Sequence, residues 1–364
     1  MRTLLNALLL LAAVASATAV GAAPAATLPA PSKVSIDPDG VTVVNGKRFF
    51  PIGIYAYELN SLVMADLHEH RFNTVIGNGF KPDQLDFLHE HGMMAVPFST
   101  PEFIAAGVAH PALLAWYLVD EPEGHDHTPA SVKKAYDDLK TKDANHPIGL
   151  CHYLFDAAAT FKGCSDFTMT DVYPITANRD VPLANVGIHM DEVRRVNGTD
   201  WPNWTYIQCF GGPETDGGKW ANPLPHEVRC MTFEALVHRA QGILYFSYWP
   251  RLPQTWASIT ELNRDLERIV PWLIAKEGKE VRAGSSEANV HLRARQVGSG
   301  WLIIAVNVGK TPCDATLAIA GLGDAELELP YEHRKKRATG GKLTERFGPF
   351  EAKVYLAGPE PRFP

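Results

Sequence analysis

The stretch that decides the fold is Leu113-Leu114-Ala115-Trp116-Tyr117-Leu118-Val119-Asp120-Glu121-Pro122, an apolar run that ends in two acids and a proline. Its length and its β-branched and aromatic content are typical of a buried parallel strand. Pro122 lacks a backbone donor and is expected to hold Glu121 extended, so the strand should end there. Barrel enzymes carry acid/base groups at such strand ends, which makes Asp120 and Glu121 candidates for function.

The same two acids could instead open a helix, with Asp120 as the N-cap residue and both acids near the positive end of the helix dipole. Residues 123–127 are poor helix formers, however, and Thr128-Pro129 is a better helix start. We therefore expect Asp120 and Glu121 on a loop, where functional residues are common.

Strand-like and amphipathic helical runs alternate on both sides of this stretch. The candidate strands are Phe49–Tyr57, Asn73–Gly77, Met93–Ser99, Leu113–Glu121, Pro147–Tyr153, Asp166–Tyr173, Trp204–Phe210 and Gly242–Trp249. Helices are expected between them, for example at Leu59–His70, Asp83–His91, Ser131–Lys140, Leu183–Val196, Pro225–Ala240 and Ile259–Lys276. Eight strands alternating with helices over about 230 residues predict a (β/α)8 barrel. A doubly wound open sheet is the alternative, although no glycine-rich dinucleotide turn follows the first strand.

Short strand-like runs separated by turns follow residue 278, and they predict a small antiparallel β-domain. The expected organisation is a signal peptide at 1–23, a Pro/Ala-rich linker at 24–33, a barrel domain at 34–278 that begins with a short strand pair, and a β-sandwich-like domain at 279–358. Asp39-Gly40 and Asn45-Gly46 are good hairpin turns for that strand pair.

The first residues have the pattern of a secretory signal, since Arg2 provides a positive charge and an apolar run from Leu4 to Val14 precedes small residues. This run is shorter than the roughly 20 residues of a membrane span. We therefore expect an exported protein, secreted or periplasmic, without a membrane anchor. The net charge of −7 and the lack of a basic stripe argue against a nucleic-acid partner. The oligomeric state does not follow from the sequence.

The five cysteines are too few for a disulfide scaffold. In an oxidising compartment Cys151 could pair with Cys164, or Cys209 with Cys230, and a role as buried thiols is equally open. No pair has CxxC spacing, so zinc has little support, and no metal or organic cofactor is expected.

Polar and aromatic residues gather at the expected strand ends. They are Tyr55 in the first strand, Asn78 after the second, Asp171 and Tyr173 in the sixth, Gln208 in the seventh, and Tyr245 and Trp249 in the eighth. Sugars offer hydroxyl groups at their edges and C–H groups on their faces, which suit carboxylates or amides and aromatic rings respectively. This set therefore predicts a carbohydrate-binding site.

Four segments also carry a family resemblance: Asn45-Gly46-Lys47-Arg48-Phe49-Phe50-Pro51-Ile52-Gly53, Phe72-Asn73-Thr74-Val75, Asp120-Glu121-Pro122 and Ser247-Tyr248-Trp249. From about Asn45 to Pro250 the chain resembles the retaining (β/α)8-barrel glycoside hydrolases of the clan that includes β-galactosidases and cellulases. The resemblance implies Glu121 as the acid/base residue, Asp120 as a contact to the sugar hydroxyl beside the reacting carbon, and Trp249 as the floor of the reacting subsite.

The clan's nucleophile is a glutamate that ends the seventh strand, where this chain has Gln208. An amide cannot form a glycosyl ester, so a second carboxylate must come from elsewhere. Asp171 is better placed than Glu214, which lies in the loop after that strand. Neighbouring strand ends place carboxyl groups roughly 5–10 Å apart, which spans the retaining and the inverting ranges.

The leading hypothesis is therefore an exported glycoside hydrolase that uses Glu121 and Asp171. The alternative is a non-catalytic carbohydrate-binding barrel that has lost its nucleophile. Two further hypotheses are a structural envelope protein and a metal-dependent hydrolase that uses Asp120, Glu121, His125 and His127.

Overall fold

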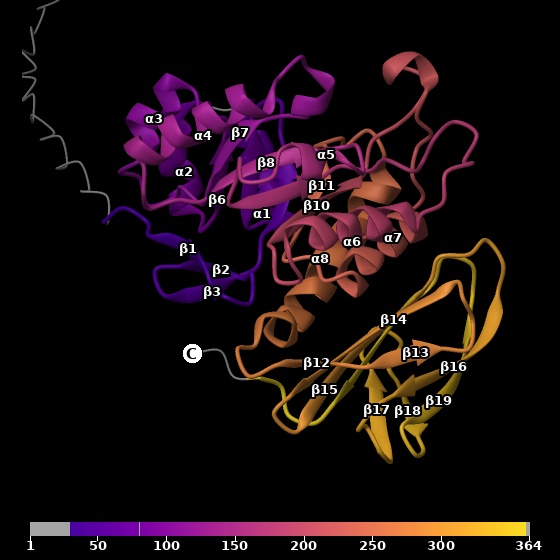
Figure 1. Ribbon diagram of the computed structural model, residues 1–364. Helices are drawn as coiled ribbons and strands as arrows, with labels where there is room; N and C mark the ends of the chain where they lie inside the picture. The colour runs from indigo at the N-terminus through magenta and orange to yellow at the C-terminus, as the bar shows by residue number, and fades with distance from the viewer. Residues whose placement is uncertain (1–29, 80, 362–364) are drawn as a thin grey trace, which may run out of the picture.

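The computed structural model describes residues 30–79 and 81–361. The expected signal peptide at 1–23 and most of the expected linker lie outside the described residues. The described chain forms an eight-stranded parallel barrel surrounded by helices, joined to two packed antiparallel sheets (Figure 1). This is the predicted fold class, and it is confirmed.

The barrel strands are β4 (Ile52–Tyr55), β5 (Thr74–Gly77), β6 (Met94–Pro97), β7 (Trp116–Val119), β8 (Ile148–His152), β9 (Phe167–Thr170), β10 (Asn203–Gln208) and β11 (Gly242–Phe246). Each lies within one of the predicted runs, apart from Asn203 one residue before the seventh. They pair in the order β6-β5-β4-β11-β10-β9-β8-β7. Isolated parallel bridges, Ala95 to Leu113 and Phe98 to Tyr117, join β6 to β7 and close the barrel.

The helices are α1 (Ser61–Glu69), α2 (Leu85–Glu90), α3 (Pro101–Gly107), α4 (Pro129–Lys142), α5 (Ala157–Thr160), α6 (Asn185–Asn197), α7 (Pro225–Val237) and α8 (Pro253–Ile274). Helix α4 begins as predicted, because the Thr128 hydroxyl accepts a hydrogen bond from the Ser131 amide and Pro129 occupies the first position. Helix α8 begins at Pro253, six residues before its predicted start. None of the described helices is both long and apolar enough to span a membrane.

A three-stranded antiparallel sheet, β1 (Val34–Ile36), β2 (Thr42–Val44) and β3 (Lys47–Phe49), covers the amino-terminal end of the barrel. Val34 packs with the side chains that fill the barrel, and its amide donates to the Asn145 carbonyl at 2.9 Å. The hydroxyl of Ser32 donates to the Leu113 carbonyl at 2.7 Å. These contacts close the end of the barrel opposite the catalytic face of such folds.

Alternate residues of the barrel strands face inward and outward. Tyr117, Cys151, Tyr206 and Leu244 pack inside the barrel, whereas residues such as Ile243 pack against the surrounding helices. All five cysteines are free, so neither disulfide considered from the sequence forms.

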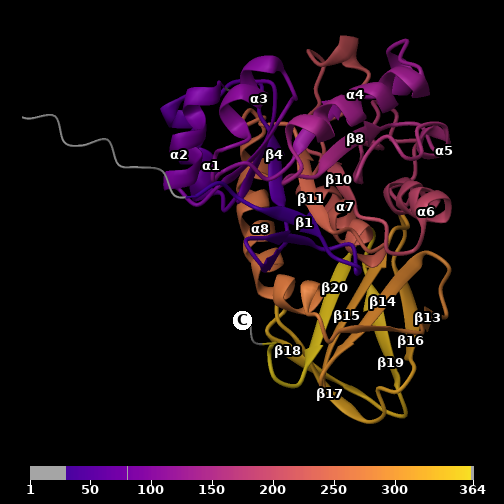
Figure 2. The same ribbon diagram turned by 60° about the vertical axis from the view of Figure 1, so that its left-hand side comes forward.

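The β-sandwich consists of the sheets β12-β14-β15-β20-β17-β18 and β13-β16-β19. Its strands are β12 (Lys279–Val281), β13 (Ala283–Ser285), β14 (Val290–Val297), β15 (Gly300–Asn307), β16 (Cys313–Ile319), β17 (Ala325–Leu329), β18 (Arg334–Ala338), β19 (Lys342–Phe347) and β20 (Ala352–Ala357). Figures 1 and 2 show the sandwich lying against α7 and α8. Leu302 and Ile304 of β15 share one apolar cluster with these helices.

Candidate active site

A cavity of about 690 Å³ opens at the carboxyl ends of the barrel strands. Loops that follow six of the strands contribute to its wall, as the barrel architecture predicts. Among its lining residues are Tyr55, Tyr57, Tyr117, Asp120, Glu121, Cys151, Asp171, Tyr173, Tyr206, Phe246 and Trp249.

Glu121 lies at a sharp turn immediately after β7. Its φ of 41° and ψ of 57° fall in the left-handed region, and Pro122 then begins a short 3₁₀ turn. The extended conformation expected from the following proline is therefore wrong. Proline disfavours the right-handed helical region for the residue before it, which leaves the left-handed region open. Non-glycine residues held there cost about 1–3 kcal/mol and cluster at functional sites.

Glu121 and Asp171 lie together at one side of the cavity. Asp171 is buried, and its Oδ1 has no hydrogen-bond partner within the described part of the chain. Burial raises the pKa of Asp171 well above its ordinary value, and the neighbouring Glu121 and Asp120 raise it further. Asp171 therefore retains its proton above the pH at which an ordinary aspartate loses its own.

Asp120 lies beside this pair and accepts a hydrogen bond from the hydroxyl of the buried Tyr117. Burial raises the pKa of Asp120, the Tyr117 hydrogen bond opposes this change, and the charge of Glu121 reinforces it. The cavity thus has three carboxyl groups at one side, and the surroundings raise the pKa values of two of them, Asp120 and Asp171.

Aromatic rings form the rest of the wall, and Phe246 at the end of β11 lies at their centre. Its ring centroid is 5.1 Å from that of Tyr55, 5.5 Å from that of Tyr173 and 5.4 Å from that of Phe210. The sequence interpretation assigned Phe246 no functional role. Trp249, the expected platform, also lines the cavity, and the guanidinium of Arg251 lies 4.9 Å from the centroid of its ring.

Six of the predicted site residues, Glu121, Asp171, Asp120, Tyr55, Tyr173 and Trp249, line this one cavity. The expected positions of Tyr245 and Gln208 need correction. Tyr245 is fully buried and packs with Phe72 outside the barrel, because it has the outward parity of β11. Gln208 is also fully buried, and its amide accepts from the Ile175 amide at 2.8 Å and donates to the Ile175 carbonyl at 3.2 Å.

Two further residues considered from the sequence lie outside the cavity lining. Asn78 is exposed and accepts a hydrogen bond of 3.3 Å from the Tyr55 hydroxyl at the edge of the cavity. Glu214 is exposed in the loop after β10 and is not among the residues that line the cavity. The structure also does not bring Asp120, Glu121, His125 and His127 together as metal ligands, among the residues it describes.

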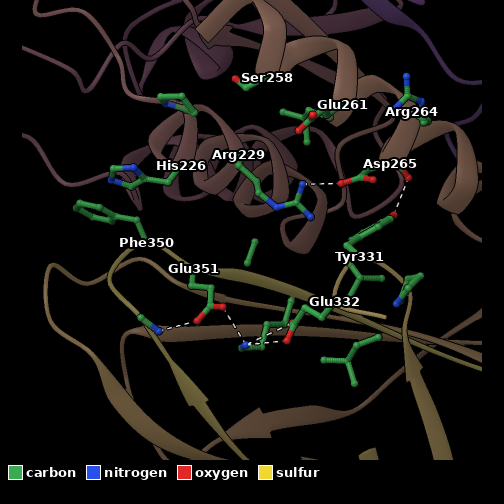
Figure 3. A pocket seen from close by; sticks show the side chains of 18 of the residues that line it. His226, Arg229, Ser258, Glu261, Arg264, Asp265, Tyr331, Glu332, Phe350 and Glu351 are labelled. Carbon is green, nitrogen blue, oxygen red and sulfur yellow. Dashed lines mark hydrogen bonds and ion pairs between the residues drawn. The ribbon is translucent and has the colours of Figure 1, made fainter. Parts of the chain in front are cut away.

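A larger cavity of about 1030 Å³ lies between α7, α8 and the sandwich, away from the barrel mouth (Figure 3). Its charged side chains pair with one another. Arg229 binds Asp265 at 2.6 Å, and Lys353 lies 2.9 Å from Glu351 and 3.3 Å from Glu332. This pairing is typical of an interface between two parts of a protein, so the barrel mouth is the better candidate site.

No family model and no curated protein matches the chain. Solved structures do match. A family 5 glycoside hydrolase from Bacteroides vulgatus is 12% identical with a TM-score of 0.61, over 89% of this chain and 92% of that one. A family 27 β-L-arabinopyranosidase from Geobacillus stearothermophilus is 10% identical with a TM-score of 0.60, over 85% and 96%. A family 30 endoxylanase from Clostridium papyrosolvens is 12% identical with a TM-score of 0.53, over 86% and 97%. At these identities the likeness establishes the fold that this chain shares with those enzymes.

Proposed function

We propose that this protein is an exported hydrolase of O-glycosidic bonds in an oligo- or polysaccharide. The observation that carries the proposal is that Glu121 and the buried Asp171 lie together at one side of an aromatic-walled barrel mouth. Paired carboxyl groups supply the acid and the base that glycoside hydrolysis needs. The solved structures with the same fold are glycoside hydrolases, which supports this reading by analogy.

In the proposed reaction Glu121 protonates the leaving oxygen, because it is partly exposed whereas Asp171 is buried beneath it. In the resting site Asp171 holds the proton; for the reaction this proton passes to Glu121, and the ionised Asp171 then acts as the second carboxylate, which activates water or attacks the sugar. The positive charge that develops on the sugar ring lies beside Asp120 and Asp171 and is stabilised by them. Phe246 and Trp249 pack against the sugar faces.

Retaining enzymes separate the two carboxyl groups by about 5–5.5 Å and inverting enzymes by about 6.5–9.5 Å. The separation of the Glu121 and Asp171 carboxyl groups when a glycan is bound therefore decides whether the proposed reaction retains or inverts the anomeric configuration.

The test is a reducing-end assay over a panel of glycans with wild-type protein and three variants. Glu121→Gln and Asp171→Asn should each lower turnover by about 10²–10⁴-fold, the usual contribution of a general acid or base. Glu214→Gln, a matched change at the exposed carboxylate of the same face, should leave turnover unchanged. Full activity of Glu121→Gln, or loss of activity in Glu214→Gln alone, would overturn this assignment.

A second candidate function, a carbohydrate-binding protein without turnover, is favoured by one specific observation. The end of β10 carries Gln208, whose amide is occupied by backbone hydrogen bonds. This candidate predicts that wild-type protein binds a glycan in calorimetry and releases no product from it, and that Asp171→Asn binds the same glycan without loss.

A further inference from the structure

Three side chains with metal-binding atoms converge where the barrel meets the sandwich, far from the barrel mouth. Glu234 lies on α7, His238 is the C-cap residue directly after this helix, and His291 lies on β14. Oε1 of Glu234 is 3.1 Å from Nε2 of His238 and 2.7 Å from Nδ1 of His291. The two imidazole nitrogens are 3.3 Å apart. Three ligand atoms of different side chains thus face one common point.

Hydrogen bonding leaves one buried atom of this cluster without a partner among the described residues. Both imidazoles approach the same oxygen of Glu234, while its other oxygen, Oε2, is buried with no hydrogen-bond partner among the described residues. Glu234 is fully buried. A buried carboxylate normally satisfies both oxygens, because an unsatisfied one costs about 1–3 kcal/mol. A cation at the common point would use the lone pairs that the three groups direct toward it.

Asp191 of α6 fixes the orientation of His238 from the other side. Its Oδ2 is 2.8 Å from Nδ1 of His238, and its Oδ1 accepts from Arg194 at 2.6 Å. Nε2 of the same ring faces Glu234 and His291. Metal-binding histidines nearly always have such a carboxylate partner on the second ring nitrogen.

Gly187 of α6 keeps the space beside these atoms open. A side chain there would bring its Cβ to 2.6 Å from Nε2 of His238 and 2.7 Å from Oε1 of Glu234. Any other residue would therefore fill the space that the two ligand atoms face. Helices α6 and α7 are in contact at this point, and α7 also contacts β14 (Figure 1).

We propose that Glu234, His238 and His291 form a site for a divalent transition metal of the zinc type, which links α7 to the sandwich. Two imidazoles and a carboxylate suit zinc better than magnesium or calcium, which prefer oxygen ligands. Ligands about 2.0–2.1 Å from a tetrahedral zinc ion lie about 3.3 Å from each other, close to two of the three separations here. The histidine side chains are 16% and 26% exposed, so solvent reaches the fourth position.

The test uses the full chain without a histidine tag, stripped with a chelator and titrated with zinc chloride in a calorimeter. Wild-type protein should bind one zinc ion, and its melting temperature should rise with zinc and not with magnesium chloride. His291→Gln should abolish stoichiometric binding, and Asp191→Asn should weaken it about 10–100-fold. His226→Ala, a change at an exposed histidine of the same helix, should bind as wild type does.

Circular dichroism of each zinc-free variant establishes that it is folded before titration. If His291→Gln does not fold, Asp191→Asn still decides the matter through its weakened affinity. Absence of zinc binding by wild-type protein would overturn the proposal, as would equal binding by wild type, His291→Gln and Asp191→Asn. Neither result bears on the proposed hydrolase activity, because this site is separate from the barrel mouth.

Discussion

Replacing Asp171 by asparagine should make the folded protein more stable at neutral pH. Asparagine has nearly the same shape and carries no charge at any pH. The substitution removes a buried acid whose pKa is raised by burial and by Glu121. Active sites commonly retain such unfavourable groups, and their removal stabilises the fold.

The magnitude follows from the raised pKa. A group whose pKa is raised in the folded state contributes its full stabilisation at pH values below its ordinary pKa, which for Asp171 is 3.8. This stabilisation is lost as the pH rises toward the pKa of the folded state. Each pH unit over that range costs about 1.4 kcal/mol. At about pH 7 the cost cannot exceed about 4 kcal/mol, so we expect Asp171→Asn to gain up to about 4 kcal/mol there and almost nothing at about pH 4.

Thermal and urea unfolding at a series of pH values measure this gain. The melting temperature of Asp171→Asn should exceed that of wild type by about 3–8 °C at about pH 7, with the difference vanishing toward about pH 4. Asp216→Asn, an exposed aspartate on the same face, should change stability by less than about 0.5 kcal/mol. A destabilised Asp171→Asn at about pH 7, or a gain that does not depend on pH, would refute the reasoning.

Three further predictions follow from individual contacts. Gly149→Ala should destabilise the barrel by about 1–3 kcal/mol in urea unfolding, because its Cβ would lie 2.7 Å from Cε2 of Phe167, whereas Gly284→Ala, with open space, should be neutral. Tyr117→Phe removes the hydrogen bond that lowers the pKa of Asp120, so the acidic limb of the pH profile of kcat/KM should move to higher pH; an unchanged profile would contradict a role for this contact. Burial raises the pKa of Glu280, but Arg293 and Arg295 outweigh this effect and lower it to about 2. Ionised Glu280 therefore stabilises the folded protein above its ordinary pKa of 4.5, and this stabilisation is lost as the pH falls toward about 2. Since its side chain is 29% exposed, Glu280→Gln should cost only about 1–2 kcal/mol at about pH 7 and nothing at about pH 2, as urea unfolding at both pH values would show.

The barrel was predictable because each of its strands is a short apolar run that ends in a turn or polar residue. The placement of Glu121 and Asp171 at one face was also predictable from the sequence, because the strand ends of a parallel barrel meet there. The sequence did not show in which direction individual side chains point. The run Gly242–Trp249 is apolar on both faces, so its sequence does not show that Phe246 points into the cavity and Tyr245 away from it.

Other features of the structure leave no recognisable pattern in the neighbouring sequence. The left-handed turn at Glu121 depends on the closed barrel, because local preference before a proline favours an extended residue. The role of Gln208 in holding the backbone at Ile175 is set by a loop that is 33 residues away in the chain. Likewise Glu234 and His291 are 57 residues apart and match no metal-binding spacing.

The apolar cluster shared by the barrel helices and the sandwich has a consequence for how the chain is made. The outer face of α7 and α8 is covered by β15 and by β20, and β20 pairs between β15 and β17 in the same sheet. Chains emerge from the ribosome amino-terminus first and begin to fold as they emerge. Part of this apolar face therefore stays uncovered until residues 352–357 have been added, and until then the place between β15 and β17 in the sandwich sheet is unfilled. Completion of the sandwich sheet and full cover of the barrel helices thus depend on the same strand.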